Sequence, residues 1–236
     1  MISIVVPVYN EAGNIARLME RVEEQIKTDK EIIVVYDFDE DTTVPVVNKI
    51  RDKYSFKIRL EKNANGEGPL NAIKTGFSLA DKNTVLVVMA DLSDSLDVVD
   101  EMYRKITKSG YDVVCGSRYM KGGRQIGGPF FKGFLSRMAG LSLHWISRIP
   151  THDVTNSFKM YRNSILKSIK IESTGGFEIG MEIVVKTYIA GYRITEVPYT
   201  WYDRTEEVSR FKTFRWMPKY MKWYFVCMFS KIAGKI

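Results

Sequence analysis

The order of apolar segments in this chain of 236 residues predicts an α/β fold with a mostly parallel sheet flanked by helices. Continuous apolar runs such as residues 2–8 and 31–36 are typical of strands buried on both faces. Segments with helical spacing alternate with these runs, which indicates right-handed crossovers between parallel strands. The composition, 45% hydrophobic and 27% charged, is that of a globular protein and argues against disorder.

The elements alternate regularly as far as Tyr119. We expect strands over residues 2–8, 31–36, 58–60, 84–89 and 112–116, and helices over residues 12–26, 43–54, 70–79 and 96–109. Residues 63–69 form a loop rich in turn-forming residues. The second half is less regular. A glycine-rich segment, 121–129, precedes an apolar stretch with basic interruptions at 130–149. Residues 157–161 are compatible with a strand, 177–190 with a helix and 192–199 with a strand. The simplest organisation is one domain, 1–212, followed by a C-terminal segment, 213–236.

The positive charge of the chain is concentrated at its C-terminal end. The net charge is +7, and residues 208–236 contain seven basic side chains and no acidic one. The rest of the chain is therefore neutral, which argues against a broad nucleic-acid surface. Eight aromatic residues accompany the basic ones, a composition typical of a membrane interface. The longest uncharged run, residues 223–230, is far shorter than the roughly 20 residues of a spanning helix.

We expect an amphipathic helix in this C-terminal segment. Pro218 is predicted to mark its first turn. Beyond it, Met221, Phe225, Met228 and Ile232 recur at helical spacing and share one face. The alternative is a helix docked on the protein's own core. Because the N-terminus runs directly into a strand, we predict no signal peptide and a location on the cytoplasmic side. The two cysteines lie far apart and indicate neither a disulfide nor a metal cluster.

Polar clusters follow the predicted strands at their carboxyl ends, where ligands bind in sheets of this kind. They comprise Asn10-Glu11, residues 37–41, residues 91–94 and Ser117-Arg118. No glycine-rich dinucleotide fingerprint and no P-loop follows the first strand, which argues against a dehydrogenase and a P-loop enzyme.

These clusters carry motifs that resemble one family. In order along the chain they read VPVYNE (6–11), YDFDEDTT (36–43), MADLSD (89–94), GSRY (116–119), DVTNSFKMY (153–161), EVP (196–198), Asp203-Arg204 and Ser209-Arg210. The series resembles the family 2 glycosyltransferases of the GT-A fold, and within them the dolichol-phosphate mannose synthases. The fold implied is a Rossmann-like sheet with a nucleotide-sugar half, 1–118, and an acceptor half, 119–212.

The resemblance implies a nucleotide-diphosphate sugar as donor. Its base and ribose would be held by Pro7, Tyr9, Glu11, Val35 and Asp37. Carboxylates suit ribose hydroxyls and base edges because they accept two hydrogen bonds. For Glu11 and Asp37 the alternative is helix N-terminal capping.

The resemblance also implies Mg²⁺ or Mn²⁺ at the segment Met89-Ala90-Asp91, which would contact the donor. Asp91 and Ser93 are the expected ligands, and the cation would neutralise the leaving diphosphate. The family has an aspartate where this chain has Met89 and a glutamine where it has Ser93. Methionine is a poor ligand for a hard cation.

The expected acceptor is a polyprenyl or dolichyl phosphate. Arg118, Arg204 and Arg210 are the expected phosphate contacts, because guanidinium groups match phosphate oxygens. The alternative is that they pair with acidic residues of the same loop. A phosphate arrives as an anion and needs no catalytic base, so the expected reaction is inverting displacement of mannose, or another hexose, from its nucleotide. Glu182 and Asp153 are the candidates for a base, with structural hydrogen bonding as their alternative.

Such a lipid acceptor requires a membrane surface. Residues 130–149 and the C-terminal segment would provide the docking face, and a membrane protein is a further candidate partner. The alternative for residues 130–149 is a core helix. Two other functions stay open: a family 2 enzyme that acts on a saccharide hydroxyl, and a non-catalytic protein that binds nucleotide sugars.

Overall fold

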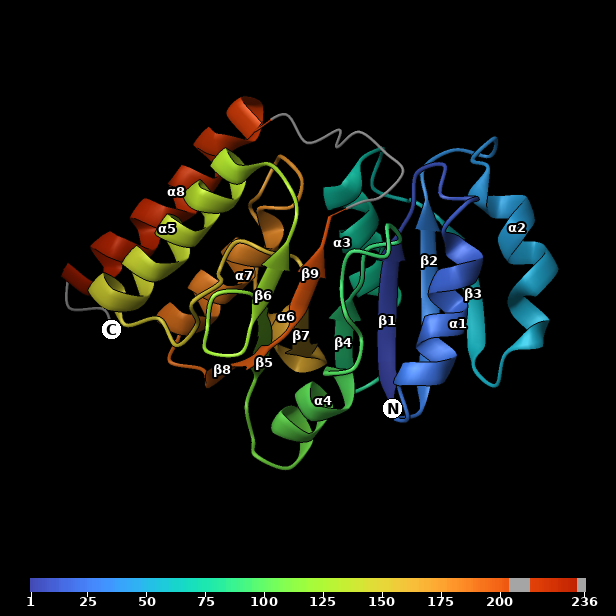
Figure 1. Ribbon diagram of the computed structural model, residues 1–236, viewed down its shortest axis with the longest axis horizontal. Coiled ribbons are helices and arrows are strands. Elements are labelled where there is room, and N and C mark those ends of the chain that lie inside the picture. The colour runs from blue at the N-terminus through green and yellow to red at the C-terminus, as the bar shows by residue number, and fades with distance from the viewer. Residues whose placement is uncertain (204–212, 233–236) are drawn as a thin grey trace.

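A seven-stranded sheet forms the centre of the computed structural model, which describes residues 1–203 and 213–232 (Figure 1). The strand order is β3-β2-β1-β4-β7-β5-β8, and every pairing is parallel except those of β7 with β4 and β5. The strands are β1 (Ile2–Pro7), β2 (Lys30–Tyr36), β3 (Lys57–Lys62), β4 (Thr84–Val87), β5 (Val113–Ser117), β7 (Lys159–Arg162) and β8 (Ile194–Pro198). The mostly parallel sheet predicted from the sequence is thus confirmed.

Helices cover both faces of this sheet. They are α1 (Ile15–Gln25), α2 (Thr43–Ile50), α3 (Pro69–Leu79), α4 (Val99–Thr107), α5 (Phe130–Ser147), α6 (Asn163–Ser168), α7 (Ile179–Ile189) and α8 (Thr213–Ile232), with a 3₁₀ turn over Arg51–Lys53. Two short strands, β6 (Arg124–Ile126) and β9 (Thr200–Tyr202), pair in parallel apart from the main sheet. Most predicted elements therefore occur, with boundaries that shift by up to four residues.

Two apolar layers hold the helices to the sheet, because successive side chains of a strand point to opposite faces. Ile4 packs with residues of α1, α2 and α4, whereas its neighbour Val5 packs with residues of α3 and α7. Helix α3 approaches β1 so closely that a Cβ at Gly76 would lie 2.2 Å from Val5 Cγ1. Only glycine allows this approach without displacing the strand.

Helices α5 and α8 lie side by side at one end of the molecule (Figure 1). Trp223 and Cys227 of α8 are buried in the same apolar layer as α7, and the Trp223 indole donates to Ser173 Oγ at 3.1 Å. Of the predicted apolar stripe of α8, Met221 and Phe225 are exposed. The alternative of a helix docked on the core therefore holds for one side of α8, and the membrane interface stays a prediction for the side that faces outward.

The prediction that Pro218 marks the first turn of this helix is wrong. Helix α8 begins at Thr213, and Pro218 lies inside it. A proline inside a helix deprives one carbonyl of its helical partner.

Candidate functional site

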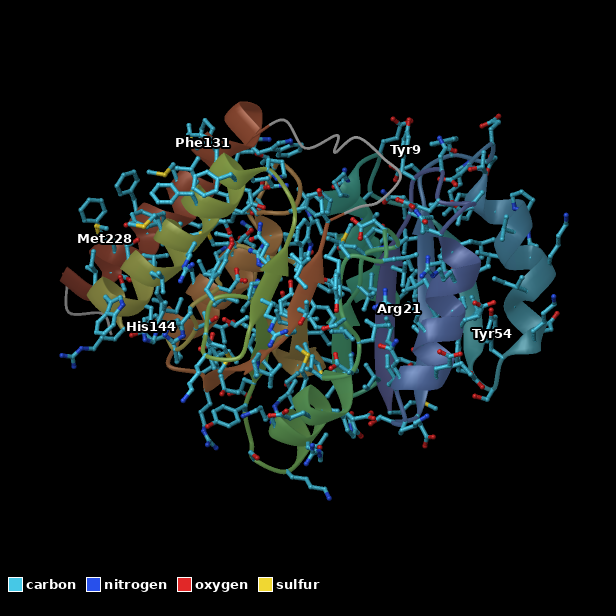
Figure 2. The ribbon with its side chains drawn as sticks, in the orientation of Figure 1. Tyr9, Arg21, Tyr54, Phe131, His144 and Met228 are labelled. Carbon is cyan, nitrogen blue, oxygen red and sulfur yellow. The ribbon has the colours of Figure 1, made fainter. Side chains whose placement is uncertain are left out.

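The carboxyl ends of β1, β2, β4 and β5 bring the predicted site segments to one edge of the sheet. Pro7 and Val35 are register partners in the β1–β2 pair, so the structure brings these two predicted donor residues together. The Val35 side chain is fully buried in the core, however, and only its backbone borders the edge. Ala90 is buried in the same way. Tyr9 lies at this edge and is half exposed (Figure 2).

The loops after β1 and β2 are locked to one another. The buried Asp41 carboxylate accepts from the Asn10 amide at 3.1 Å and from the Thr43 amide at 2.8 Å. Asn10 has a φ of 58° and returns a bond, since its side-chain oxygen accepts from the Thr42 amide. This exchange explains why an asparagine occupies the left-handed position between the strand and α1.

Tyr9 and Glu11 project from the first of these loops. The Tyr9 ring meets Phe38 edge-on, with ring centroids 5.3 Å apart. The Glu11 carboxylate accepts from the Asn14 side chain at 2.8 Å, whereas no side chain caps the start of α1. The backbone carbonyl of Glu11 accepts from the Asn14 and Ile15 amides at 3.0 and 2.9 Å, so Glu11 lies directly at the start of α1.

Asp37 organises the loop before α3. One carboxylate oxygen accepts from Asn63 Nδ2 at 2.8 Å, and the other accepts from the Gly68 amide at 2.9 Å. Gly68 directly precedes α3, so Asp37 also holds the start of that helix, as its capping alternative proposed. Asn63 in turn accepts from Thr75 Oγ1 at 2.8 Å. Our sequence reasoning missed Asn63, since a polar residue in a turn-rich loop carries no signal of its partner.

The loop after β4 presents Asp91 and Ser93. Asp91 Oδ1 accepts from Ser93 Oγ at 2.6 Å and from the Ser93 amide at 3.1 Å. Leu92 between them has a φ of 62°, which is rare for a leucine. Arg21 of α1 holds this strained turn in place by donating to Leu92 O at 2.9 Å and to Asp94 O at 2.6 Å. Sequence reasoning did not find Arg21, because it is one of several charges along its helix.

Asp94 lies beneath the same loop and is 5% exposed. Its Oδ2 is buried without a hydrogen-bond partner within the described part of the chain. Burial, together with the neighbouring charge of Asp91, raises the pKa of Asp94 to about 7. The turn is also hydrogen-bonded to β9 of the small sheet. The Tyr202 amide donates to the Ser93 carbonyl oxygen, and the Ser95 amide donates to the Thr200 carbonyl oxygen.

Arg118 is buried and bound to Asp153. Its Nε donates to Asp153 Oδ2 at 2.6 Å and its Nη2 to Asp153 Oδ1 at 2.9 Å. Nη2 also reaches Ser136 Oγ of α5 at 3.0 Å. Burial disfavours both charges, but each stabilises the other, so the pKa of Arg118 is raised and that of Asp153 is lowered. The predicted phosphate contact is thus largely engaged by a carboxylate, and the pair ties α5 to the end of β5.

Glu182, the other candidate base of the acceptor half, also has structural partners, as does His152. Glu182 accepts from the Glu172 and Ser173 amides at 2.6 and 2.7 Å and pairs with Lys186 at 2.8 Å. Burial raises the pKa of Glu182, but these bonds outweigh it and leave the pKa lowered. His152 pairs with Glu196 at 2.5 Å.

Arg204 and Arg210, the remaining predicted phosphate contacts, lie outside the described residues. Met89 is half buried at the end of β4. The site described here therefore comprises the donor-side loops, the turn over residues 89–94 and the Arg118–Asp153 pair.

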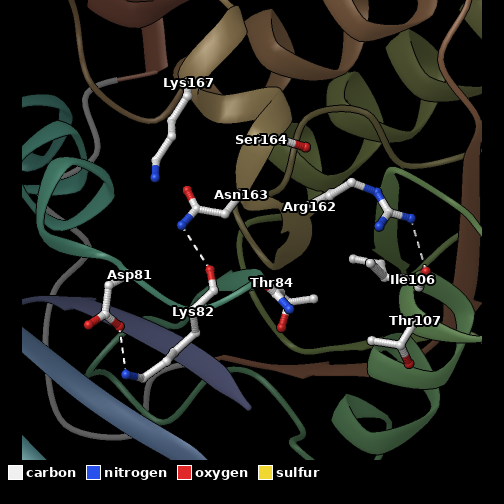
Figure 3. Close-up of a pocket in the computed structure, with 10 residues that line it drawn as sticks. Asp81, Lys82, Thr84, Ile106, Thr107, Arg162, Asn163, Ser164 and Lys167 are labelled. Carbon is white, nitrogen blue, oxygen red and sulfur yellow. Dashed lines mark hydrogen bonds and ion pairs between the residues drawn. The ribbon is translucent and has the colours of Figure 1, made fainter.

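A cavity of about 600 Å³ lies elsewhere, between α6 and the start of β4 (Figure 3). Two of its lining cations, Arg162 and Lys82, pair with Asp112 and Asp81. Thr84 begins β4, so this cavity lies at the opposite end of the strand from Asp91. It takes no part in the site.

A comparison with known protein families identifies the family of this chain. The model of "Glycosyl transferase family 2" matches residues 3–170, more than half of the sequence. The chain belongs to this family. The family resemblance noted in the motifs is thereby confirmed.

Two curated family relatives match over most of the chain. The dolichol-phosphate mannosyltransferase of Pyrococcus furiosus is 29% identical over 233 residues, which are 94% of this chain and 64% of the relative. The polyprenol monophosphomannose synthase of Mycolicibacterium smegmatis is 23% identical, over 88% of this chain and 79% of the relative. The chain therefore spans less than two thirds of the length of the Pyrococcus protein.

Solved structures confirm the GT-A fold of the family. Glucosyl-3-phosphoglycerate synthase from Mycobacterium tuberculosis, in complex with Mn²⁺, UDP and glucosyl-3-phosphoglycerate, superposes with a TM-score of 0.70 and 13% identity. The match covers 97% of this chain and 80% of that one. TarS from S. aureus superposes with a TM-score of 0.60 and 20% identity, covering 85% of this chain and 59% of that one.

Proposed function

We propose that this chain transfers a hexose, with mannose favoured, from a nucleotide-diphosphate sugar to a polyprenyl or dolichyl phosphate at a membrane surface. The family and the names of the two curated relatives support this proposal. GDP-mannose is the expected donor.

The observation that carries the proposal is the state of the acceptor-half carboxylates. A hydroxyl acceptor must lose a proton during attack and so needs a base whose pKa is near the working pH. Asp153 and Glu182 are bound to cations or amides, and the pKa of each is lowered. Both are therefore poor bases, and Asp94, whose pKa is raised to about 7, lies in the donor half beneath the turn over residues 89–94. A phosphate monoester has a second pKa of about 6 and arrives as an anion, so it can attack without a base.

On the donor side, the Tyr9–Phe38 pair and the carboxylates of Glu11 and Asp37 border the edge where the nucleotide would lie. The ring pair offers an apolar surface for a base, and the carboxylates offer acceptors for ribose hydroxyls. Asp37 is held by Asn63 and Gly68, so its position is fixed before a ligand binds.

The turn over residues 89–94 fits a divalent cation. Asp91 and Ser93, the ligands expected from the sequence, provide hard oxygen atoms in this turn. Within the described residues no group of three or more His, Cys, Asp and Glu side chains is close enough to hold a metal. This agrees with Mg²⁺ or Mn²⁺ sites that use one or two carboxylates together with substrate phosphates. When bound, the cation would neutralise charge on the leaving diphosphate.

Transfer would then be a single displacement. An oxygen of the acceptor phosphate forms a bond to the anomeric carbon as the bond from that carbon to the diphosphate breaks, which inverts the configuration. Arg118, fixed by Asp153, and the adjacent Ser136 would define the acceptor side, with Arg204 and Arg210 as further phosphate contacts.

The outer face of α5 and α8 supports a lipid acceptor. Phe131 and Met228 point outward from these helices in Figure 2. The face bears exposed apolar side chains along both helices: Phe130, Phe131, Phe134, Met138, Trp145 and Ile146 on α5, and Met217, Met221, Phe225, Val226 and Phe229 on α8. Across the described residues, no helix has the length and apolar character required to cross a bilayer. We infer that the two helices rest on the membrane surface, where Ser136 connects α5 to the site.

Radiolabelled transfer tests the reaction. The chain is incubated with GDP-mannose or UDP-glucose and a short polyprenyl phosphate, with Mg²⁺, Mn²⁺ or EDTA. Labelled lipid from GDP-mannose is expected. Nucleotide binding without a lipid product would refute the lipid acceptor and favour a saccharide hydroxyl or a non-catalytic protein.

Vesicle sedimentation tests the membrane face. Replacing Phe225 and Phe229 together with serine is expected to reduce binding to anionic vesicles at least tenfold, since each buried aromatic contributes about 1.5–3 kcal/mol. Tyr192→Ser, at an exposed residue outside both helices, is the matched control and should bind as the wild type does. Equal binding by all three proteins would show that the face has another partner.

A further inference from the structure

The loop after β4 departs from its family pattern at the position where a carboxylate is expected. Met89 stands there, and its thioether is a poor ligand for a hard cation. Asp91 therefore lacks the companion carboxylate that the family resemblance implies two residues before it.

A different carboxylate lies in the same turn. Asp94 is 95% buried, and its Oδ2 has no hydrogen-bond partner within the described residues. A buried acceptor without a partner is destabilising, and more so when it is charged. Proteins keep such groups rarely, and then usually where an ion or ligand completes the set.

The fold holds Asp94 in this position through its backbone, and the Tyr199 hydroxyl and the Met89 amide are the donors that face its carboxylate. Arg21 donates to the backbone carbonyls of Leu92 and Asp94, and Asp94 forms an isolated bridge with Trp201. The left-handed Leu92 reverses the chain between Asp91 and Asp94. Asp91 and Asp94 are therefore two carboxylates of one turn, and repulsion between like charges is relieved where a cation is bound between them.

We propose that Asp94 is a ligand of the divalent cation, together with Asp91 and Ser93, in place of the carboxylate missing at Met89. The inference rests on the proposed function, in which Mg²⁺ or Mn²⁺ assists departure of a nucleoside diphosphate. Two carboxylates and a hydroxyl leave the remaining positions to diphosphate oxygens and water, as Mg²⁺ and Mn²⁺ prefer.

Mn²⁺ binding to the full chain tests this assignment without reference to turnover. Free Mn²⁺ is followed by electron paramagnetic resonance, with GDP, with UDP and without nucleotide. Asp94→Asn is expected to weaken Mn²⁺ affinity at least tenfold. Asp97→Asn, a nearby exposed aspartate, is the matched control and should bind as the wild type does. Adding Met89→Asp to Asp94→Asn should restore at least part of the lost affinity.

Each other outcome overturns the assignment. Equal Mn²⁺ affinity in the wild type and Asp94→Asn would show that Asp94 is not a ligand, as would absence of Mn²⁺ binding to the wild type. Thermal melting of Asp94→Asn verifies that the variant is folded. Failure of the proposed function is distinguished by the transfer assay, since a wild type that binds Mn²⁺ through Asp94 yet makes no glycolipid would refute only the reaction.

Discussion

The Arg118–Asp153 pair gives the sharpest test of how this site is built. Asp153 is fully buried, and the Arg118 side chain is 11% exposed. Asp153→Asn keeps the shape of the side chain but leaves a buried guanidinium without its counter-charge. Breaking a buried ion pair in this way costs about 3–5 kcal/mol. We therefore expect a large loss of stability from a change of very few atoms.

The loss of stability can be expressed as a decrease in melting temperature. Unfolding entropy is about 2.1 cal/mol/K per residue, which gives roughly 0.5 kcal/mol/K for this chain. A cost of 3–5 kcal/mol then lowers Tm by about 6–10 °C. Circular dichroism at neutral pH measures this shift. Removing both charges, with Arg118→Met added to Asp153→Asn, should recover at least part of it, because the buried charge is gone.

The stabilisation that Asp153 contributes depends on pH in a definite direction. The pKa of Asp153 is lowered in the folded state by Arg118, against the opposing effect of burial. Its stabilisation is therefore complete above the pKa of the unfolded chain, near 4, and is lost as the pH falls through the lower folded value. The Tm difference between wild type and Asp153→Asn should stay constant from pH 5 to 8 and shrink in stronger acid. If Asp153→Asn left Tm unchanged but abolished transfer, the pair would serve the reaction and not the fold.

Three further changes test other parts of the structure. Trp223→Ala should cost about 3–5 kcal/mol in urea unfolding, because it leaves a cavity where α8 docks; a change below 1 kcal/mol would mean that α8 is not packed on the core. Gly76→Ala should destabilise by about 1–3 kcal/mol, since its Cβ would meet Val5 at 2.2 Å; wild-type stability would contradict that close approach. Asn63→Ala should weaken nucleotide binding by calorimetry about tenfold while Tm changes little, because Asp37 loses a partner; unchanged binding would remove Asp37 from the donor site.

The alternation of strands and helices, and the edge of the sheet where the site lies, could be predicted from the pattern of residues along the chain. Apolar runs and helical periodicity report burial locally, since each residue's environment repeats along its own element. The motifs 6–11, 36–43 and 89–94 follow strands that are parallel, so their meeting at one edge followed from topology alone. The apolar stripe of α8 was equally visible in its spacing.

The tertiary structure alone decided which polar groups engage one another. Arg118 pairs with Asp153 across 35 residues, and Arg21 reaches Asp94 across 73. It also decided which face of α8 is buried. Periodicity identifies the apolar face of a helix but not the element against which that face packs. A buried charged group pairs with whichever opposite charge the folded chain brings near it. Such choices depend on distances between remote segments, which no local pattern of residues encodes.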